Sequence, residues 1–400
     1  MKINIYLKLI LIYLIVGLLC SGCSQHSHIK DNGIIVGAQR LDLYLPLLAG
    51  KKVALVVNQT SRVNNQHLVD FLQQKGVDIR FIFAPEHGFR GDHDAGEKVS
   101  NSIDSKTGIP LVSIYGKSKK PSSEIMAELD LIIFDIQDVG VRFYTYISSM
   151  HYMMEAASDA HVEFIVFDRP NPNGMYVDGP TLEAEFRSFV GMHPIPLVHG
   201  LTVGELAKMI KGEGWLETKN KLHLTVIPIK NYSHNKRYSL PVQPSPNLPN
   251  DLAIALYSSL GFFEATPVSI GRGTPYPFQL IGHDKISIGD YQFTPISTPG
   301  AATKPKLMDT QLKGTRLLSA SKVGINLDYI LAWYSKFSQQ KQLFFSRAKF
   351  MDKLAGTDKL RKSIEQGETK AQIRQGWQPG INEFINKRKP YLLYDDFIKK

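Results

Sequence analysis

The residues best suited to chemistry stand close together in Pro85-Glu86-His87-Gly88-Phe89-Arg90-Gly91-Asp92. A proline fixes the backbone at the start of this stretch, two glycines permit a tight path, and four side chains are ionisable. A carboxylate such as Glu86, next to an apolar run, can serve as a general acid. His87 and Arg90 beside it can orient it or bind a substrate. A surface turn with incidental charges is the alternative interpretation.

Two acids, an arginine and two tyrosines lie together in Asp135-Ile136-Gln137-Asp138-Val139-Gly140-Val141-Arg142-Phe143-Tyr144-Thr145-Tyr146. Such side chains suit a carbohydrate, whose hydroxyl groups need hydrogen bonds and whose C–H faces stack on aromatic rings. We therefore predict a functional role for Asp138 and substrate contacts for Arg142, Tyr144 and Tyr146. The alternative is a helix N-terminus whose acids complement the helix dipole and whose aromatic side chains lie in the core.

Later clusters add further candidates. Asp168-Arg169-Pro170-Asn171-Pro172 carries an adjacent acid and base, which can form a structural pair or hold a substrate carboxylate. His199-Gly200 precedes a predicted helix, where a structural histidine competes with a functional one. Phe262-Phe263-Glu264-Ala265-Thr266-Pro267 and Gly271-Arg272-Gly273-Thr274 supply one acid and one arginine. A plain turn is the alternative for these last two segments.

Apolar, β-branched runs end directly before the polar residues in the first half of the chain, and helix-like stretches separate the runs. The runs are Lys52–Val57, Ile79–Ala84, Leu111–Ile114, Leu131–Phe134 and Phe164–Phe167. This alternation predicts an α/β fold with a parallel sheet. Ligands of open α/β sheets bind beyond the carboxyl ends of the strands, so the polar clusters fall where a site is expected. The chain is therefore an enzyme candidate.

The remaining pattern predicts more elements and a change of composition. Helices are predicted over Asn65–Gln74, Ser122–Leu129, Tyr146–Ala160, Thr202–Lys211 and Asp251–Leu260, and a strand over Leu222–Ile229. Thr202 and Glu205 fit a capping box. Four prolines between Pro241 and Pro249 predict an extended crossing, because proline suits neither a helix interior nor an inner strand. From about Gly282 short strand and helix signals alternate, which predicts a second, smaller domain.

The N-terminus predicts export. Two lysines flank the start of an apolar stretch that ends in Cys20-Ser21-Gly22-Cys23. Small residues before a cysteine resemble the lipobox of bacterial lipoproteins, although Cys20 stands where that signal usually has leucine. We predict a lipoprotein signal peptide over 1–23, lipidation of Cys23, a tether over 24–36 and anchorage to a membrane. An ordinary cleaved signal peptide or an uncleaved anchor is the alternative.

Cysteine usage and charge narrow the class of protein. Cys20 and Cys23 are the only cysteines, so the mature body has neither disulfides nor thiol chemistry. Ser24, rather than aspartate, follows Cys23, which suits sorting to the outer membrane in a Gram-negative cell. The net charge is +10, the lysines are scattered, and no nucleic-acid motif accompanies them. We interpret this charge as solvated surface and predict no nucleic-acid partner.

Several catalytic motifs are absent from the sequence. There is no Gly-x-Gly-x-x-Gly after the first run, no P-loop and no Gly-x-Ser-x-Gly, which counts against dinucleotide binding, NTP binding and α/β serine hydrolysis. A metal site is an alternative, with candidate ligands His87, Asp92, His93, Asp94 and His199. Because this spacing matches no tight zinc motif, we predict no metal or other cofactor.

As a set, the clusters resemble those of one family, the exo-β-N-acetylmuramidases, long catalogued as a domain of unknown function. The motifs are Pro85–Gly91, Asp135–Tyr146, Asp168–Pro172, Leu197-Val198-His199-Gly200-Leu201-Thr202-Val203-Gly204-Glu205, Pro246-Asn247-Leu248-Pro249 and Phe263-Glu264 with Gly271–Thr274. The resemblance covers roughly 35–400. It implies a Rossmann-like catalytic domain over 37–255, mostly parallel with helices on both faces, and a smaller α+β domain over 256–400 that completes the cleft. The implied activity is release of N-acetylmuramic acid from non-reducing ends of peptidoglycan fragments.

The same resemblance assigns residues. Glu86 matches the family's proposed catalytic glutamate. The motif positions around the cleft are matched by His87, Arg90, Asp138, Tyr144, Asp168, Arg169, His199, Glu264 and Arg272, and Arg142, Tyr146 and Asn247 lie within the motifs. The chain departs from the family at Ser61, where glycine is usual, at Pro267, where asparagine is common, and at Gly282-His283, where Ala-Pro is expected. These departures lie beside the motifs rather than within them.

Cleavage of a glycosidic bond needs an acid on the leaving oxygen and a second group that stabilises the oxocarbenium-like centre. Glu86 is the predicted acid. Asp138, Glu264 or the acetamido group of the sugar itself are candidates for the second group. A muramyl residue also carries a lactyl carboxylate, for which arginines such as Arg142, Arg169 or Arg272 are natural partners.

Two other functions stay open. A non-catalytic lipoprotein that binds wall fragments would use the arginines and aromatic side chains but would not depend on Glu86. A metal-dependent hydrolase built on the candidate ligands named above would lose its activity with a chelator.

Overall fold

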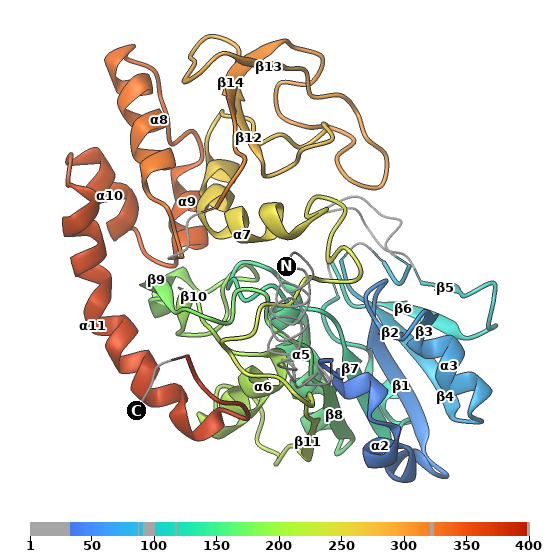
Figure 1. Ribbon diagram of the computed structural model, residues 1–400. Coiled ribbons are helices and arrows are strands. Elements are labelled where there is room, and N and C mark those ends of the chain that lie inside the picture. Colours follow the sequence, from blue (N-terminus) through green and yellow to red (C-terminus); the bar gives the residue numbers. More distant parts are fainter. Residues whose placement is uncertain (1–32, 87, 91–100, 117, 321–323, 398–400) are drawn as a thin grey trace, which may run out of the picture. The chain divides into compact units, whose positions relative to one another are not determined.

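Parallel strands form the main sheet, and all five predicted runs are among them (Figure 1). The structure is a computed structural model that describes residues 33–86, 88–90, 101–116, 118–320 and 324–397. The parallel strands are β1 (Lys52–Val57), β4 (Asp78–Ala84), β6 (Pro110–Ser113), β7 (Leu131–Asp135), β8 (Glu163–Phe167) and β11 (Leu224–Ile227). A short strand, β5 (Ser102–Ile103), pairs antiparallel with β6 at one edge.

The strand order is β11-β8-β7-β1-β4-β6-β5, so the order reverses between β1 and β7. Counted along the chain, the parallel strands follow the doubly wound Rossmann arrangement, whose ligand site lies at this reversal. The register places Val57 beside Asp135 and Ala84 beside Ser113. The carboxyl ends of these neighbouring strands therefore meet at one edge of the sheet. The predicted α/β fold with a mostly parallel sheet is confirmed.

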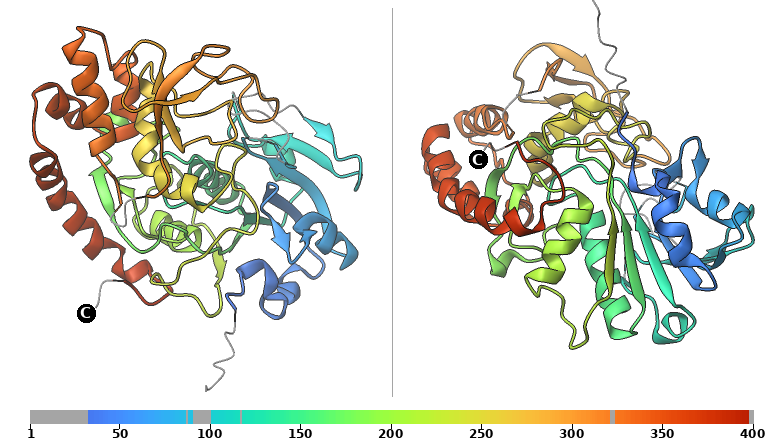
Figure 2. Two further views of the ribbon diagram at one scale, coloured as in Figure 1. Left: turned by 45° about the horizontal axis from the view of Figure 1, so that its top comes forward. Right: turned by 60° about the horizontal axis from the view of Figure 1, so that its bottom comes forward.

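Helices cover both faces of the sheet, because alternate residues of a strand point to opposite sides. Val53, Leu55 and Val57 of β1 belong to a core shared with α2 (Leu41–Leu48) and α3 (Leu68–Gln74). Ala54 and Val56 belong to another core, shared with α5 (Tyr146–Asp159) and α6 (Val203–Gly212). Figure 2 shows the sheet between these helix layers.

The observed helices differ from the predicted ones mainly at their ends. α6 begins with the predicted capping box, in which the side chains of Thr202 and Glu205 each accept a backbone N–H from the other residue. α7 spans Asp251–Leu260 as predicted. α4 is limited to Ser123–Met126, with Ser122 as its N-cap.

The helix predicted from Asn65 begins only at Leu68. The residues before it, β2 (Arg62–Val63) and β3 (Gln66–His67), form a two-stranded antiparallel pair around Asn64, whose φ is 53°. Strands of two residues have no periodicity, so the helix pattern extended over them by mistake.

The chain after α7 supplies a small antiparallel sheet of order β12-β14-β13 and several helices. Its elements are η3 (Gly261–Ala265), β12 (Leu280–His283), β13 (Tyr291–Phe293), β14 (Leu312–Arg316), α8 (Asp328–Gln339), α9 (Ala348–Ala355), α10 (Lys359–Glu365), α11 (Lys370–Arg388) and η4 (Lys389–Tyr391). Earlier in the chain lie η1 (Gly37–Gln39), β9 (Asp178–Thr181), η2 (Ala184–Phe186) and β10 (Pro196–Val198). α11 packs along β9 and β10. The predicted domain boundary at 255/256 falls inside α7, and the division into domains stays a prediction.

Several predictions fall outside the described residues. They concern the signal peptide over 1–23 with Cys23, the predicted tether over 24–36 as far as residue 32, and His87, Asp92, His93 and Asp94. In the described part of the chain, no helix is both long and apolar enough to cross a membrane.

Candidate active site

A cavity of about 630 Å³ opens beyond the carboxyl ends of β4, β6 and β7. It is lined by Glu86, Tyr115, Phe143, Tyr144, Thr145, Tyr146, Phe189, Val190, Ser245, Asn247, Leu248, Tyr257, Gly261, Glu264, Arg272, Phe278, Arg347, Phe350 and Leu354. Many of these side chains are aromatic and a few are charged, as is typical of a pocket that binds a sugar ring.

Glu86 is the acid that the sheet delivers to this cavity. It follows the end of β4 by two residues, and Gly88 turns the chain with a φ of 76°. The hydroxyl of Tyr115, just after β6, donates to Glu86 Oε1 over 3.0 Å, and the hydroxyl of Thr145 donates to Oε2 over 2.9 Å. Thr145 is the N-cap residue of α5. Three elements therefore fix the carboxyl group in one orientation.

Tyrosines pack around the cavity floor. Tyr144 lies edge-on to Tyr146 and to Tyr257, with ring centroids 5.0 and 6.0 Å apart. The Tyr144 hydroxyl donates to the carbonyl oxygen of Pro244 over 2.6 Å. Burial raises the pKa of all three phenols, so they stay neutral and can donate hydrogen bonds.

Another part of the lining carries several charged side chains. The Arg272 guanidinium donates to Glu264 Oε1 over 2.7 Å. Burial alone would raise the pKa of Glu264, but Arg272 and then Lys306 and Arg347 outweigh burial, so this pKa lies below its ordinary value. Glu264 is thus ionised at neutral pH. Because three cationic side chains surround one carboxylate, this region can accept a further anion.

The cavity brings together Glu86, Tyr144, Tyr146, Asn247, Glu264 and Arg272 from the residues predicted from sequence. These positions are separated by up to 186 residues, and the sheet edge and the segment after α7 collect them. Asn247 also bonds within the protein, since its Nδ2 donates to the carbonyl oxygen of Ala301 over 2.8 Å.

Asp138 and His199 are buried together outside the cavity lining. Asp138 Oδ2 accepts the backbone N–H of Gly140 over 2.7 Å, and His199 Nδ1 accepts that of Leu201 over 3.2 Å. The ring proton of His199 therefore belongs on Nε2, 3.6 Å from Asp138 Oδ2. That distance is too long for a hydrogen bond. A catalytic role for Asp138 and a substrate role for His199 stay predictions.

The side chains of Asp168 and Arg169 bind other partners, although the backbone N–H of Arg169 donates to Asp168 Oδ1 over 3.0 Å. Arg169 donates to both oxygens of Asp135, over 2.6 and 2.8 Å, in a fully buried ion pair. Asp168 accepts from the hydroxyl of Thr202 and the backbone N–H of Gly204, both over 2.8 Å, at the start of α6. Neither side chain lines the cavity, and substrate contacts for them stay predictions.

Two predicted arginines also lie away from the cavity lining. Arg142 is fully buried and donates to the carbonyl oxygens of Pro180, Ile195 and Ala355 over 2.6 to 2.8 Å. Arg90 binds Asp104 through two nitrogens, over 3.0 to 3.2 Å. These contacts hold backbone segments together, and substrate binding by either arginine stays a prediction.

Some lining residues were not predicted as site residues. Tyr115 follows an apolar run, so the strand-end argument that selected Glu86 could have selected it as well. Thr145 stands inside a predicted cluster. Phe189, Tyr257 and Arg347 lie in segments without a local pattern that points to a site.

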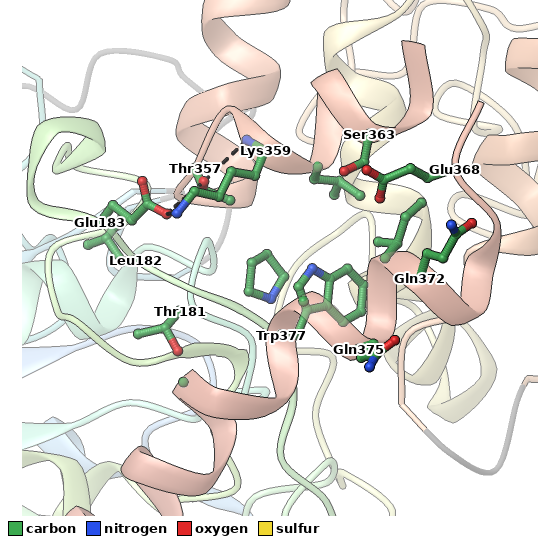
Figure 3. A pocket seen from close by; sticks show the side chains of 15 residues that line it. Thr181, Leu182, Glu183, Thr357, Lys359, Ser363, Glu368, Gln372, Gln375 and Trp377 are labelled. Carbon is green, nitrogen blue, oxygen red and sulfur yellow. Dashed lines mark hydrogen bonds and ion pairs between the residues drawn. The ribbon is translucent and has the colours of Figure 1, made fainter. Parts of the chain in front are cut away.

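A larger cavity, of about 690 Å³, lies between β9 and the helices α10 and α11 (Figure 3). Trp377 and Gln372 of α11 face it, and at one end Glu183 binds Lys359 over 2.8 Å and Thr357 over 3.0 Å. None of the predicted site residues that the structure describes lines it. We take the cavity at the strand ends as the candidate active site, because it holds a carboxylate oriented by several elements.

Among the residues that the structure describes, no group of three or more His, Cys, Asp or Glu side chains is placed to hold a metal ion.

Comparison with known proteins decides the family. The family described as exo-β-N-acetylmuramidase NamZ matches the chain with its N-terminal part over residues 53–252 and its C-terminal part over residues 255–394. The chain belongs to this family. It is thus a member of a family of glycoside hydrolases, as the sequence motifs predicted.

Individual relatives support the same family membership. The chain is similar to the peptidoglycan β-N-acetylmuramidase NamZ of Bacillus subtilis (strain 168), with 38% identity over 373 residues, which cover 88% of this chain and 89% of the relative. It is also similar to two crystal structures of DUF1343 family proteins from Bacteroides fragilis NCTC 9343. The first has 45% identity and a TM-score of 0.83, and covers 91% of this chain and 99% of that one. The second has 28% identity and a TM-score of 0.79, with coverages of 90% and 99%.

Proposed function

We propose that this protein is an exo-acting β-N-acetylmuramidase that releases N-acetylmuramic acid from the non-reducing ends of peptidoglycan fragments. The single observation that carries the proposal is the placement of Glu86, whose carboxyl group is oriented by Tyr115 and Thr145 inside a cavity of about 630 Å³. The family membership of the chain and its similarity to the Bacillus subtilis enzyme support it.

Glu86 acts as the general acid that protonates the leaving oxygen. Glu264 lines the same cavity and is ionised, so it is placed to stabilise the positive charge that develops on the sugar. Asp138, the other carboxylate candidate, lies outside the lining. The acetamido group of the sugar is the remaining candidate for the second catalytic group.

The cationic part of the lining explains a preference for a muramyl residue. Arg272 and Arg347 both line the cavity, where Arg272 is ion-paired with Glu264 and also feels the charge of Glu86. The lactyl carboxylate of N-acetylmuramic acid would add a second anion at this place and form charge-assisted hydrogen bonds. N-acetylglucosamine lacks this carboxylate, so the arginines would not form these hydrogen bonds with it.

The N-terminal sequence supports a proposal for the place of action. A lipid on Cys23 would anchor the protein at a membrane, on the periplasmic side in a Gram-negative cell, where wall fragments are released. Treatment of cells with a lipoprotein signal peptidase inhibitor tests this, because the precursor would then accumulate with its signal peptide attached.

Chromogenic aryl glycosides test the specificity. We expect the protein to hydrolyse an aryl β-N-acetylmuramide and not the N-acetylglucosaminide, with or without a chelator. Arg347→Met should lower kcat/KM on the muramide by about tenfold or more. Lys349→Met is the matched control, since Lys349 in α9 is exposed like Arg347, the N-cap residue of that helix, but does not line the cavity.

Three outcomes would contradict the proposal. Binding of muramyl saccharides without any release would favour a binding lipoprotein. Loss of activity with the chelator would favour the metal-dependent hydrolase. Equal rates on the muramide and the glucosaminide would refute the role of the arginines.

A further inference from the structure

A row of aromatic rings leads out of the candidate active site. Tyr115 and Phe189 both line the cavity, with ring centroids 5.9 Å apart. Tyr152 of α5 continues the row outside the lining, and its ring stacks on Phe189 with centroids 6.4 Å apart and an interplanar angle of 17°. All three side chains are partly exposed. The row therefore presents aromatic surface both inside the cavity and beyond it.

A lysine lies over the outer part of this row. The Lys119 ammonium group is 4.8 Å from the ring centroid of Phe189 and 5.3 Å from that of Tyr152. Contacts of this kind attract the cation to the ring faces and hold the two rings in place. The ammonium group also offers hydrogen-bond donors beside the rings, where sugar hydroxyls would need partners.

The position of Glu86 decides which part of the substrate meets this row. An acid that protonates the glycosidic oxygen lies between the sugar that is released and the saccharide that leaves. Tyr115 touches both the row and the acid, because its hydroxyl donates to Glu86 Oε1. The cationic part of the lining, with Arg272 and Arg347, comes from other segments and suits the lactyl carboxylate.

We propose that Tyr115, Phe189 and Tyr152 form the platform that binds the leaving saccharide, whose first residue in peptidoglycan is N-acetylglucosamine. This inference rests on the proposed function. The neutral pyranose ring stacks its C–H face on Phe189, and Lys119 donates to its hydroxyl groups. The next residue of the saccharide reaches Tyr152. The platform thus favours oligosaccharides over small leaving groups.

Two substrates with similar leaving-group chemistry test the platform. One is the disaccharide of N-acetylmuramic acid β-1,4-linked to N-acetylglucosamine, and the other is methyl β-N-acetylmuramide, which has no second ring. The quantity compared is the ratio of kcat/KM on the disaccharide to kcat/KM on the methyl glycoside. We expect Phe189→Ala to lower this ratio about tenfold and Phe189→Trp to preserve it, because tryptophan retains a stacking face.

Controls separate the possible results. Phe186→Ala, in the same segment but outside the lining, should leave the ratio unchanged. Tyr152→Ala, on the exposed side of α5, provides a second variant if Phe189→Ala does not fold. For this variant a tetrasaccharide replaces the disaccharide, and we expect the ratio of kcat/KM on the tetrasaccharide to kcat/KM on the methyl glycoside to fall. An unchanged ratio in the Phe189 and Tyr152 variants would overturn the platform alone. If the wild-type protein cleaves neither muramide, the proposed function fails and the platform fails with it.

Discussion

Two hydroxyl groups present Glu86 to the candidate active site. They come from the second residue after β6 and from the N-cap of α5, so the orientation of the carboxyl group depends on the packing of β4, β6 and α5. A general acid needs this fixed geometry, because the proton must reach the leaving oxygen along a hydrogen bond.

Tyr115→Phe tests this orientation. The substitution removes the hydroxyl that donates to Glu86 Oε1 but keeps the ring of the aromatic row. A hydrogen bond to a carboxylate contributes about 1.5 to 3 kcal/mol, so we expect kcat on the disaccharide to fall about tenfold or more while KM changes little. Steady-state kinetics check this, and an unchanged kcat would show that Tyr115 does not orient the acid.

At the residue scale, the local sequence pattern predicts site residues most directly where they follow a strand. Glu86 stands directly after an apolar run, and the sheet topology brings it to the cavity. Arg142 also follows a strand in the sequence, but its side chain is buried and donates to backbone carbonyl oxygens instead of facing the cavity. Arg347 reaches the cavity from the C-terminal part, and nothing near it in the sequence indicates that.

At the element scale, the long strands and the capped helix α6 were predictable, because burial on both faces leaves an apolar run and a cap leaves a Thr–Glu pair. The start of α3 could not be predicted in this way, because its N-cap is His67 rather than a residue with high N-cap preference. His67 Nδ1 accepts the backbone N–H of Val69 over 3.3 Å, and Nε2 lies 2.9 Å from the carbonyl oxygen of Asn58.

This cap predicts a dependence of stability on pH. Burial lowers the pKa of His67 from 6.5 to about 4, and Nδ1 is already occupied as an acceptor. The unfolded chain therefore binds a proton at a higher pH than the folded protein does. The stabilisation is complete above pH 6.5 and is lost as the pH falls towards 4, by an amount on the order of 3 kcal/mol.

His67→Asn provides the comparison, because asparagine caps helices but does not titrate. Urea unfolding of both proteins at pH 7.5, 5.5 and 4.5 measures the effect. We expect the wild type to lose more unfolding free energy than the variant on acidification. Parallel losses in both proteins would contradict the role of His67.

At the scale of the whole molecule, Arg142 connects parts of the chain that are far apart in sequence. Its guanidinium donates to carbonyl oxygens of Pro180 and Ile195 and, 213 positions along the chain, to that of Ala355. The sequence predicted the parallel sheet from local patterns, but such long-range packing leaves no local signal. This is why the sequence offered Glu264 and Arg272 as candidate residues, and only the family motifs placed them at the same cleft as Glu86.

Arg142→Met tests the structural role. The substitution leaves several buried carbonyl oxygens without donors, each at a cost of about 1 to 3 kcal/mol, so we expect the unfolding free energy to fall by about 3 kcal/mol or more. Arg187→Met is the matched control, because Arg187 forms an exposed ion pair with Glu217 and should change stability by less than about 1 kcal/mol. A raised KM with unchanged stability would instead support the predicted contact with substrate.

The most direct test of the account is the effect of Glu86→Gln on substrates that differ in their need for an acid. The muramyl disaccharide has a poor leaving group, whereas 2,4-dinitrophenyl β-N-acetylmuramide has one that leaves without protonation. We predict that the variant loses about 1,000-fold in kcat on the disaccharide and far less on the dinitrophenyl glycoside. Equal losses on both substrates, or retention of activity on the disaccharide, would contradict the assignment of Glu86 as the general acid.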